Sequence, residues 1–212
     1  MADLRMVDPE TLDDLATYVT RARSLGSDGA IRLQARGREL AAYVEVLPGH
    51  GLSMSGATIG LRVMGLAEPA DVDVTVSLAS VSDRLARSRT SPGAGDTLAI
   101  PPATVRVGWA AMGPPRSGWE VVGDLAVEEL RTVATQGITE ITEGSPEGSG
   151  AQVVAALRQR VWGRPSQTIP PVPSGAAFAA YALGFLTQQS ARVYAHGHWT
   201  RLSTASGHVL VR

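Results

Sequence analysis

The residues best suited to recognition chemistry lie in a loop at positions 113–119, with the sequence Gly-Pro-Pro-Arg-Ser-Gly-Trp. Its two prolines stiffen the backbone, and its two glycines permit unusual dihedral angles. An arginine held beside an indole can bind a carboxylate or a phosphate through directed hydrogen bonds. We therefore predict a binding site at Arg116, Ser117 and Trp119. The alternative is a structural turn, in which the Trp fills the core and the Arg pairs with a surface acid.

Three histidines near the end of the chain invite a metal site. An extended segment 191–203 would place His196 and His198 on one face of a strand. If the turn lies at 205–207, His208 pairs with Thr204, and His198 is then about 20 Å away at the rise of a strand. All three therefore cannot share one metal. His196 and His198 remain weak candidates for a site completed by a distant carboxylate, and ordinary surface histidines are the alternative.

Missing residue types exclude much other chemistry. The chain contains no lysine, asparagine or cysteine, and all nineteen of its basic residues are arginine. It therefore lacks a Schiff-base or P-loop lysine, a thiol nucleophile and a Cys-ligated zinc or Fe–S site. We expect no cofactor. Asp71 and Asp73 share one strand face, a pattern seen at magnesium sites, but solvated acids are common at such a strand start.

The charges are distributed unevenly along a chain whose formal net charge is −1. Residues 148–212 contain six arginines, three histidines and no carboxylate, whereas residues 107–147 contain seven acids and two arginines. Arg201 and Arg212 lie in the closing strands and are further binding candidates. The segment either forms a basic surface for an acidic partner or is neutralised within the fold, and the sequence leaves both readings open.

The periodicity of apolar residues predicts an α+β fold of mainly antiparallel strands with four to five helices. Helices are predicted at 8–24, 80–89, 124–142, 151–162 and 175–187, the first capped by Asp8 and the third by Asp124. Hairpins are predicted at 30–46, 58–78, 97–109 and 191–212. The first turns at residues 36–38, the second at 67–70 and the last at 205–207.

The length of 212 residues fits one compact domain over 1–212, with a possible subdivision at the Gly/Ser-rich stretch 144–150. Helix 175–187 is apolar nearly all round, which predicts burial or self-association. The longest apolar stretch is too short to cross a bilayer, and the first residues lack a signal-peptide pattern. We therefore expect a soluble, cytoplasmic protein that does not enter membranes.

Several segments resemble a conserved hypothetical protein family of actinobacteria with unknown function. They are 32–35 (Arg-Leu-Gln-Ala), 114–119 (Pro-Pro-Arg-Ser-Gly-Trp), 183–186 (Leu-Gly-Phe-Leu), and the closing segments 199–204 and 207–212. The resemblance runs the length of the chain. It implies a small cytoplasmic protein from a GC-rich organism, and it brings no activity, cofactor or catalytic residue.

Three functions are therefore compatible with the sequence. The first is a non-enzymatic binding protein. It would bind a protein partner or a second copy of itself through Arg116, Trp119 and the basic C-terminal segment. The second is a small hydrolase or phosphoryl-handling enzyme in which histidines meet carboxylates. The third is a nucleic-acid binder that resembles one unit of a DNA sliding clamp, because a helix precedes antiparallel strands and a second helix follows them.

Overall fold

A computed structural model describes residues 3–26, 28–90, 95–146, 148 and 150–212, with only the backbone described at 89 and 90. The described chain contains five α-helices, a two-stranded sheet and a six-stranded sheet. The strand pairings with a defined register are antiparallel. The predicted α+β class with mainly antiparallel strands is therefore confirmed.

The chain forms two compact units, which we describe separately. The first comprises residues 1–46 and 61–113, and the second comprises residues 47–60 and 114–212. The stretch 144–150 lies inside the second unit, between two of its helices. Whether the whole chain behaves as one domain stays a prediction.

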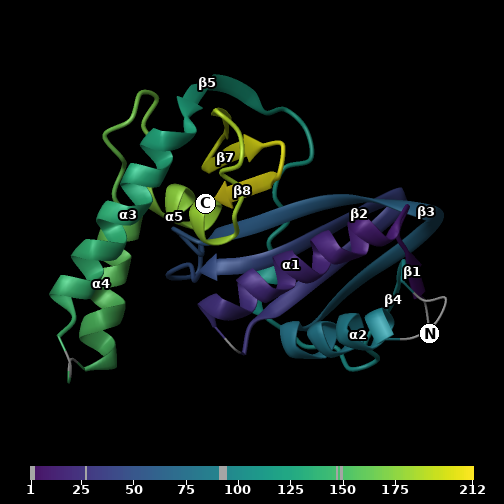
Figure 1. The fold of residues 1–212 in the computed structure, drawn as a ribbon. Coiled ribbons are helices and arrows are strands. Elements are labelled where there is room, and N and C mark those ends of the chain that lie inside the picture. Colours follow the sequence, from purple (N-terminus) through teal and green to yellow (C-terminus); the bar gives the residue numbers. More distant parts are fainter. Residues whose placement is uncertain (1–2, 27, 91–94, 147, 149) are drawn as a thin grey trace. The chain divides into compact units, whose positions relative to one another are not determined.

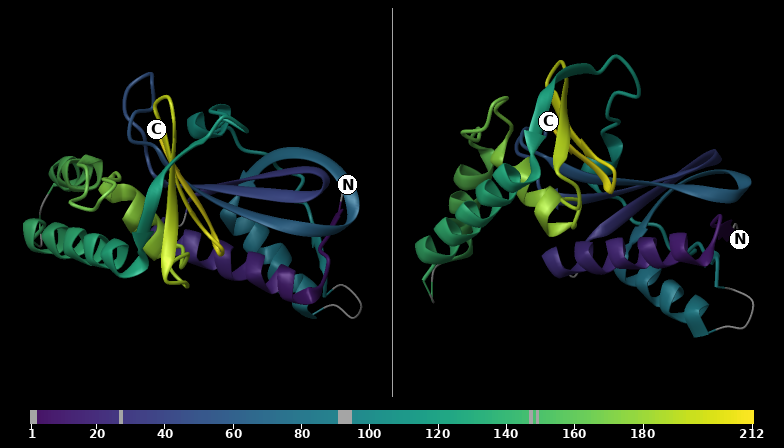
Figure 2. Two further views of the ribbon diagram at one scale, coloured as in Figure 1. Left: turned by 90° about the horizontal axis from the view of Figure 1, so that it is seen from above. Right: turned by 45° about the horizontal axis from the view of Figure 1, so that its top comes forward.

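The first unit contains two long strands and two helices. Its elements are β1 (Asp3–Arg5), α1 (Pro9–Leu25), β2 (Ala30–Leu47), β3 (Thr58–Ser77), α2 (Leu78–Thr90), β4 (Thr97–Ala99) and a short 3-10 helix (Gly108–Ala111). Helices α1 and α2 lie side by side on one face of the β2–β3 ribbon (Figures 1 and 2). The buried side chains of Leu15, Leu33 and Val81 belong to the core of this unit.

Helix α1 begins as the sequence predicts. The Asp8 carboxylate accepts hydrogen bonds from the hydroxyl and the backbone N–H of Thr11, at 2.6 and 2.7 Å. These two hydrogen bonds hold the pKa of the Asp8 carboxyl below its usual range. Pro9 occupies the first turn, where its missing N–H costs no intrahelical bond.

The extended segment β2 (Ala30–Leu47) includes residues 36–38, where the sequence predicts a turn. From Ile31 to Ala35 the buried residues are odd-numbered (Ile31, Leu33, Ala35), and from Leu40 to Val46 they are even-numbered. Gly37, with φ of +61°, lies where the parity changes. A turn centred on Gly37 accounts for this change, because it would set Ala35 opposite Leu40 on one face, and residues 36–39 are exposed. The extended segment β3 (Thr58–Ser77) likewise includes residues 67–70, where the second turn is predicted.

The predicted hairpin at 97–109 is wrong in its second half. Only Thr97–Ala99 forms a strand, and it pairs with β1 rather than with residues 104–109. Pro101 and Pro102 follow directly and cannot donate ladder hydrogen bonds. Residues 100–107 then connect β4 to the 3-10 helix. In this connection the Val105 N–H donates a hydrogen bond to the Thr75 carbonyl at 2.9 Å.

The two carboxylates weighed as a magnesium pair are ion-paired with arginines of β2. Arg32 donates to both carboxylate oxygens of Asp73 at 2.7 Å, and Arg36 lies 2.8 Å from Asp71. Among the described residues, no cluster of His, Asp and Glu could hold a metal ion. The two aspartates of β3 therefore form ion pairs with β2.

The Arg32–Asp73 pair gives a prediction for pH dependence. Hydrogen bonding from Arg32 holds the pKa of Asp73 below its usual range. A lowered carboxyl pKa stabilises the fold above the ordinary value of about 3.9, and the contribution is lost as the pH falls through the lowered pKa. Asp73→Asn is therefore expected to reduce the urea midpoint at pH 7, with the difference shrinking as the pH falls below the ordinary carboxyl value of about 3.9. The more exposed Asp71→Asn serves as control, with a smaller loss. An unchanged deficit of Asp73→Asn in acid would contradict this account.

The second unit combines three helices with a sheet. Its elements are β5 (Glu120–Ala126), α3 (Val127–Gly144), α4 (Ala151–Gly163), α5 (Ser174–Ala182), β6 (Ser190–His196), β7 (Trp199–Thr204) and β8 (Gly207–Val211). The strand order is the start of β3, then β8, β7, β6 and β5. The predicted closing hairpin is in fact a three-stranded meander, because a second tight turn lies at Gly197 and His198.

Two predictions about the helices of this unit need correction. Asp124 does not cap α3: it lies in β5 and pairs with Arg192, and Ala126 precedes the helix. Helix α5 ends at Ala182 rather than at residue 187, and seven consecutive residues, Ser174 to Ala180, are buried; self-association through it stays a prediction. These residues pack within the unit against α3, α4 and β8. The apolar sequence of α5 therefore reflects a core helix.

No helix in the described part of the chain has the length and apolar character needed to cross a membrane.

Candidate functional site

Trp119 and Arg201, predicted separately as binding residues, are in contact. The Arg201 guanidinium carbon lies 4.7 Å from the centre of the Trp119 ring. The indole N–H of Trp119 donates to the Pro115 carbonyl at 2.9 Å, so the stiff loop holds the ring in place. A guanidinium over an aromatic face is attracted by the negative face of the ring. The loop 113–119 and strand β7 thus build one site.

The antiparallel register adds a second aromatic ring. Tyr194 on β6 lies directly opposite Arg201 on β7, and the guanidinium carbon is 4.1 Å from the Tyr194 ring centre. Arg201 therefore contacts both Trp119 and Tyr194. This contact restricts an otherwise flexible side chain and lowers the entropy lost when a ligand binds.

Three further aromatic or basic side chains lie on the same side of the sheet. His196 lies opposite Trp199 in the register and therefore on the same face as Tyr194 and Arg201. The His196 ring meets the Trp119 ring edge-on at 5.9 Å, and the Arg212 guanidinium lies 5.8 Å from the Trp199 ring centre. We call this set the aromatic–arginine face: Trp119, Tyr194, His196, Trp199, Arg201 and Arg212.

The two arginines of this face carry uncompensated charge. Neither Arg201 nor Arg212 forms an ion pair with an acid anywhere in the described part of the chain. The Arg201 Nε is buried without a hydrogen-bond partner among these residues. A buried donor without a partner costs about 1–3 kcal/mol. The face therefore presents two arginine charges without an acidic partner among the described residues.

Arg116 and Ser117 sit on the exposed side of the same loop. Within the described residues neither forms a hydrogen bond or an ion pair, so the surface acid expected in the structural-turn alternative is not there. Trp119 is half-buried. The loop therefore has a feature of each alternative. The Trp119 indole packs against neighbouring residues, and Arg116 has no acidic partner among the described residues.

The predicted two-histidine site is wrong in its geometry. His196 ends β6, and His198 lies in the turn before β7, so they do not share a strand face. His208 pairs with Ser203 in the register and shares a hydrogen bond of 2.9 Å between its Nδ1 and the Ser203 hydroxyl. In the portion of the chain that is described, neither His196 nor His198 bonds to a carboxylate. The enzyme alternative gains no support from these residues.

The acid-free segment 148–212 is neutralised only in part. Arg164 forms a two-point pair with Glu140 on α3, and Arg192 pairs with Asp124 on β5. Both acids come from the acidic stretch before Glu147. The remaining arginines, which have no acidic partner among the described residues, are Arg158, Arg160, Arg201 and Arg212.

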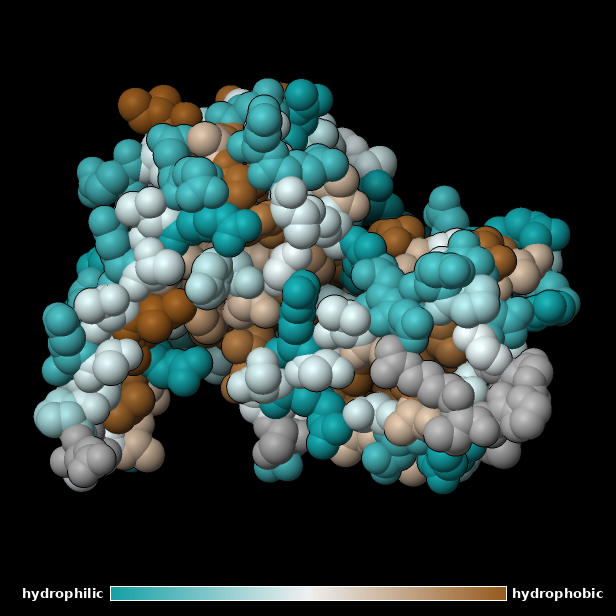
Figure 3. All heavy atoms as spheres, in the orientation of Figure 1, coloured by the Kyte–Doolittle hydropathy of each residue, from teal (hydrophilic) through white to brown (hydrophobic). Residues whose placement is uncertain are grey.

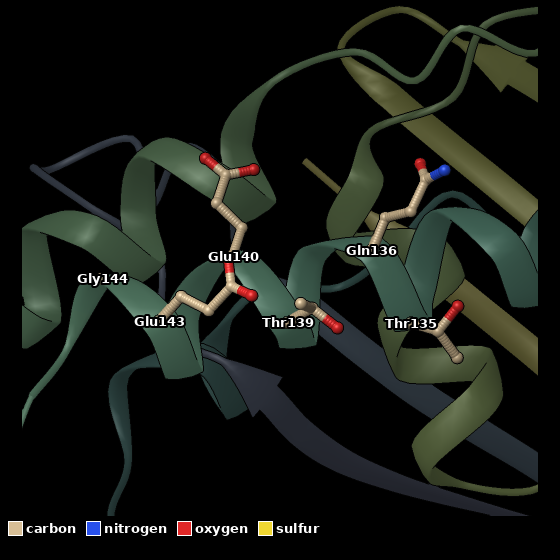
Figure 4. Close-up of a pocket in the computed structure, with 6 residues that line it drawn as sticks. All are labelled: Thr135, Gln136, Thr139, Glu140, Glu143 and Gly144. Atoms are coloured by element: carbon tan, nitrogen blue, oxygen red, sulfur yellow. The ribbon is translucent and has the colours of Figure 1, made fainter.

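A shallow cavity of about 610 Å³ lies along α3, lined by Thr135, Gln136, Thr139, Glu140, Glu143 and Gly144 (Figure 4). All six residues belong to one helix, and Glu140 and Gln136 extend to the same side. Glu140 is already paired with Arg164. This surface offers acidic side chains without an opposing wall, and we assign it no ligand.

The sequence did not single out Tyr194, although the signal was present. Gly197, with φ of +55°, and His198 form a two-residue turn, and such a turn fixes the register of the strands on either side. Reading this turn places Tyr194 opposite Arg201. Without this turn, the alternation predicts one long strand.

Residues 1–110 match the family model described as a domain of unknown function, DUF8010. The chain belongs to the DUF8010 family. Residues 114–212 of this DUF8010 protein match a second model, a domain of unknown function named DUF8185. The expected resemblance to a family of unknown function is therefore confirmed. No curated protein matches the sequence.

Solved structures of other proteins are similar in fold to this DUF8010 protein. A protein described as a DNA polymerase III beta subunit from Eubacterium rectale is similar, with a TM-score of 0.57 and 11% identity. A DNA polymerase sliding clamp from Pseudomonas aeruginosa gives a TM-score of 0.51 and 12% identity. The alignments cover 99% and 100% of this chain and 64% of each of those chains. At this identity the likeness shows a shared fold.

Proposed function

We propose that the protein is a non-enzymatic binding protein that recognises an acidic segment of a partner protein through the aromatic–arginine face. The observation that carries this proposal is the placement of Arg201 against Trp119 and Tyr194, without an acidic partner among the described residues. A guanidinium fixed in this way offers a carboxylate its planar set of donors. Arg212, over Trp199, adds a second charge on the same face.

The expected result for this face is charge-dependent binding of an acidic peptide. A fluorescein-labelled 15-residue peptide of Glu, Asp and Gly is titrated with the protein at low salt and followed by fluorescence anisotropy. Arg201→Gln combined with Arg212→Gln is expected to weaken binding at least about tenfold, since bonds to charged groups contribute about 1.5–3 kcal/mol each. Arg201→Lys keeps the charge but loses the planar fork, and we expect an intermediate loss.

Arg106→Gln is the matched control, because Arg106 is exposed and has no ion-pair partner among the described residues. Circular dichroism and thermal unfolding establish that each variant is folded. Equal peptide affinity in the double variant and the wild type would overturn the proposal.

A second candidate function, nucleic-acid binding, is supported by the likeness to the sliding-clamp fold. The same titration with single- and double-stranded oligonucleotides separates the two candidates. Tighter binding of DNA than of peptide, falling steeply with salt, would favour the second candidate. The peptide proposal expects the reverse order.

A further inference from the structure

A groove in the second unit lies between α4 and the connection that leaves β2. Its volume is about 770 Å³, within the range of about 300–1,000 Å³ that small-molecule sites occupy. We call it the α4 groove. Its lining residues are Leu47, Pro48, His50, Ser55, Gly56, Ala155, Ala156, Arg158, Gln159, Arg160, Trp162, Gly163 and Arg164. All of them belong to the second unit, and none belongs to the aromatic–arginine face.

One side of the α4 groove is apolar and rigid. Trp162 is 5% exposed and stacks on Phe178 with 4.4 Å between ring centres. Ala155 and Ala156 are exposed on the helix surface that lines the groove. Small side chains there let an apolar body lie close to the helix backbone. Apolar residues also reach the surface over α3 and α4 in the space-filling view (brown, Figure 3).

The polar side of the α4 groove is cationic. Arg158 and Arg160 line it, and neither forms a hydrogen bond or an ion pair within the described residues. Arg164 also lines it, but its charge is matched by Glu140, with 2.6 Å between the paired atoms. None of the lining residues is acidic. Two exposed positive charges thus border an apolar wall, with no internal anion to satisfy them.

We propose that the α4 groove binds a small organic anion with an apolar body, of the class of medium-chain carboxylates. The apolar body would lie against Trp162 and the two alanines, where burial removes its surface from water. The carboxylate would take charge-assisted hydrogen bonds from Arg158 or from Arg160, which lie two residues apart on α4 and therefore border the groove from different sides. The volume favours a small molecule, and the charge favours an anion.

The test is calorimetric titration of the full chain with sodium decanoate, sodium hexanoate and decyltrimethylammonium, each below its micelle concentration. Decanoate is expected to bind. Hexanoate should bind at least tenfold more weakly because it buries less apolar surface. Decyltrimethylammonium should not bind, since it presents the wrong charge. Equal binding of the cation would overturn the proposal, because it would show a site selected by apolar character alone.

Substitutions of residues that line the α4 groove test whether decanoate binds there. Arg158→Gln combined with Arg160→Gln should weaken decanoate binding at least tenfold, and Ala156→Phe should abolish it by filling the groove. Arg106→Gln should leave it unchanged. Ala156 is exposed, so its substitution tests the groove with little risk to the fold. Undiminished binding in both groove variants would sink the proposal.

Failure here is separable from failure of the aromatic–arginine face. Arg201→Gln should leave decanoate affinity intact, because Arg201 does not line the groove. If the acidic peptide binds and decanoate does not, and Arg158→Gln with Arg160→Gln abolishes the peptide signal, the groove is a peptide-docking surface. That outcome overturns the small-molecule proposal.

Discussion

Deletion of Gly37 is expected to unfold the first unit. Gly37 lies where the buried residues of β2 change from odd to even positions. Removing one residue shifts the second half of the strand by one, which turns Leu40, Val44 and Val46 to the opposite face. Each such side chain loses about 1.5–3 kcal/mol of burial. Three of them together approach the whole stability of an ordinary domain, about 5–15 kcal/mol.

Urea unfolding followed by circular dichroism measures this loss. Gly37→Asn is the matched control, because asparagine tolerates a positive φ and keeps the residue count, so we expect a small change. Gly37→Val should fall between the two, since a β-branched residue is strained at φ of +61°. A wild-type urea midpoint for the deletion would show that the parity change does not depend on Gly37.

Gly137→Ala is expected to destabilise the second unit, although the same change usually strengthens a helix. In a helix interior alanine is favoured over glycine by about 1 kcal/mol. At position 137, however, a Cβ would lie 2.3 and 2.5 Å from two ring carbons of Trp162. That ring is 5% exposed and stacked on Phe178, so it has little room to move. Overpacking of this kind costs about 1–3 kcal/mol, and thermal unfolding should show a drop of several degrees.

The control is Gly163→Ala on α4, where an added Cβ meets no atom within 4 Å. It should be neutral or slightly stabilising. In a Trp162→Leu background the penalty of Gly137→Ala should shrink, because the ring that causes the clash is gone. An undiminished penalty there would place the cause in the helix backbone and contradict the packing argument.

Local signals predicted most of the elements, and long-range pairing was where prediction failed. Helix α1 follows from Asp8, Pro9 and the 3.6-residue period, all of which act within a few residues. The predicted hairpin at 97–109 is the contrary case, because β4 pairs with β1 and not with residues 104–109. That pairing depends on residues far along the chain.

The candidate site shows the same division. Arg116, Trp119 and Arg201 were chosen by residue type and by loop chemistry. That Trp119 and Arg201 meet depends on a register set by the turn at Gly197, about eighty residues beyond the loop. The neutralisation of Arg164 and Arg192 by acids on α3 and β5 could not be derived, because net charge along a sequence does not give distances. The α4 groove had no sequence signature at all.

The division of the chain into units has a practical consequence for anyone who shortens it. The second family model begins at residue 114, but the structural unit also includes residues 47–60. The end of β8 is bonded to that earlier segment, with Arg212 N–H donating to the Ala57 carbonyl at 3.1 Å and Gly56 N–H donating back at 2.6 Å. A fragment cut at residue 114 would therefore carry a bare strand edge, and such edges recruit other chains. A fragment of residues 114–212 alone is therefore expected to aggregate through this strand edge, which size-exclusion chromatography would detect.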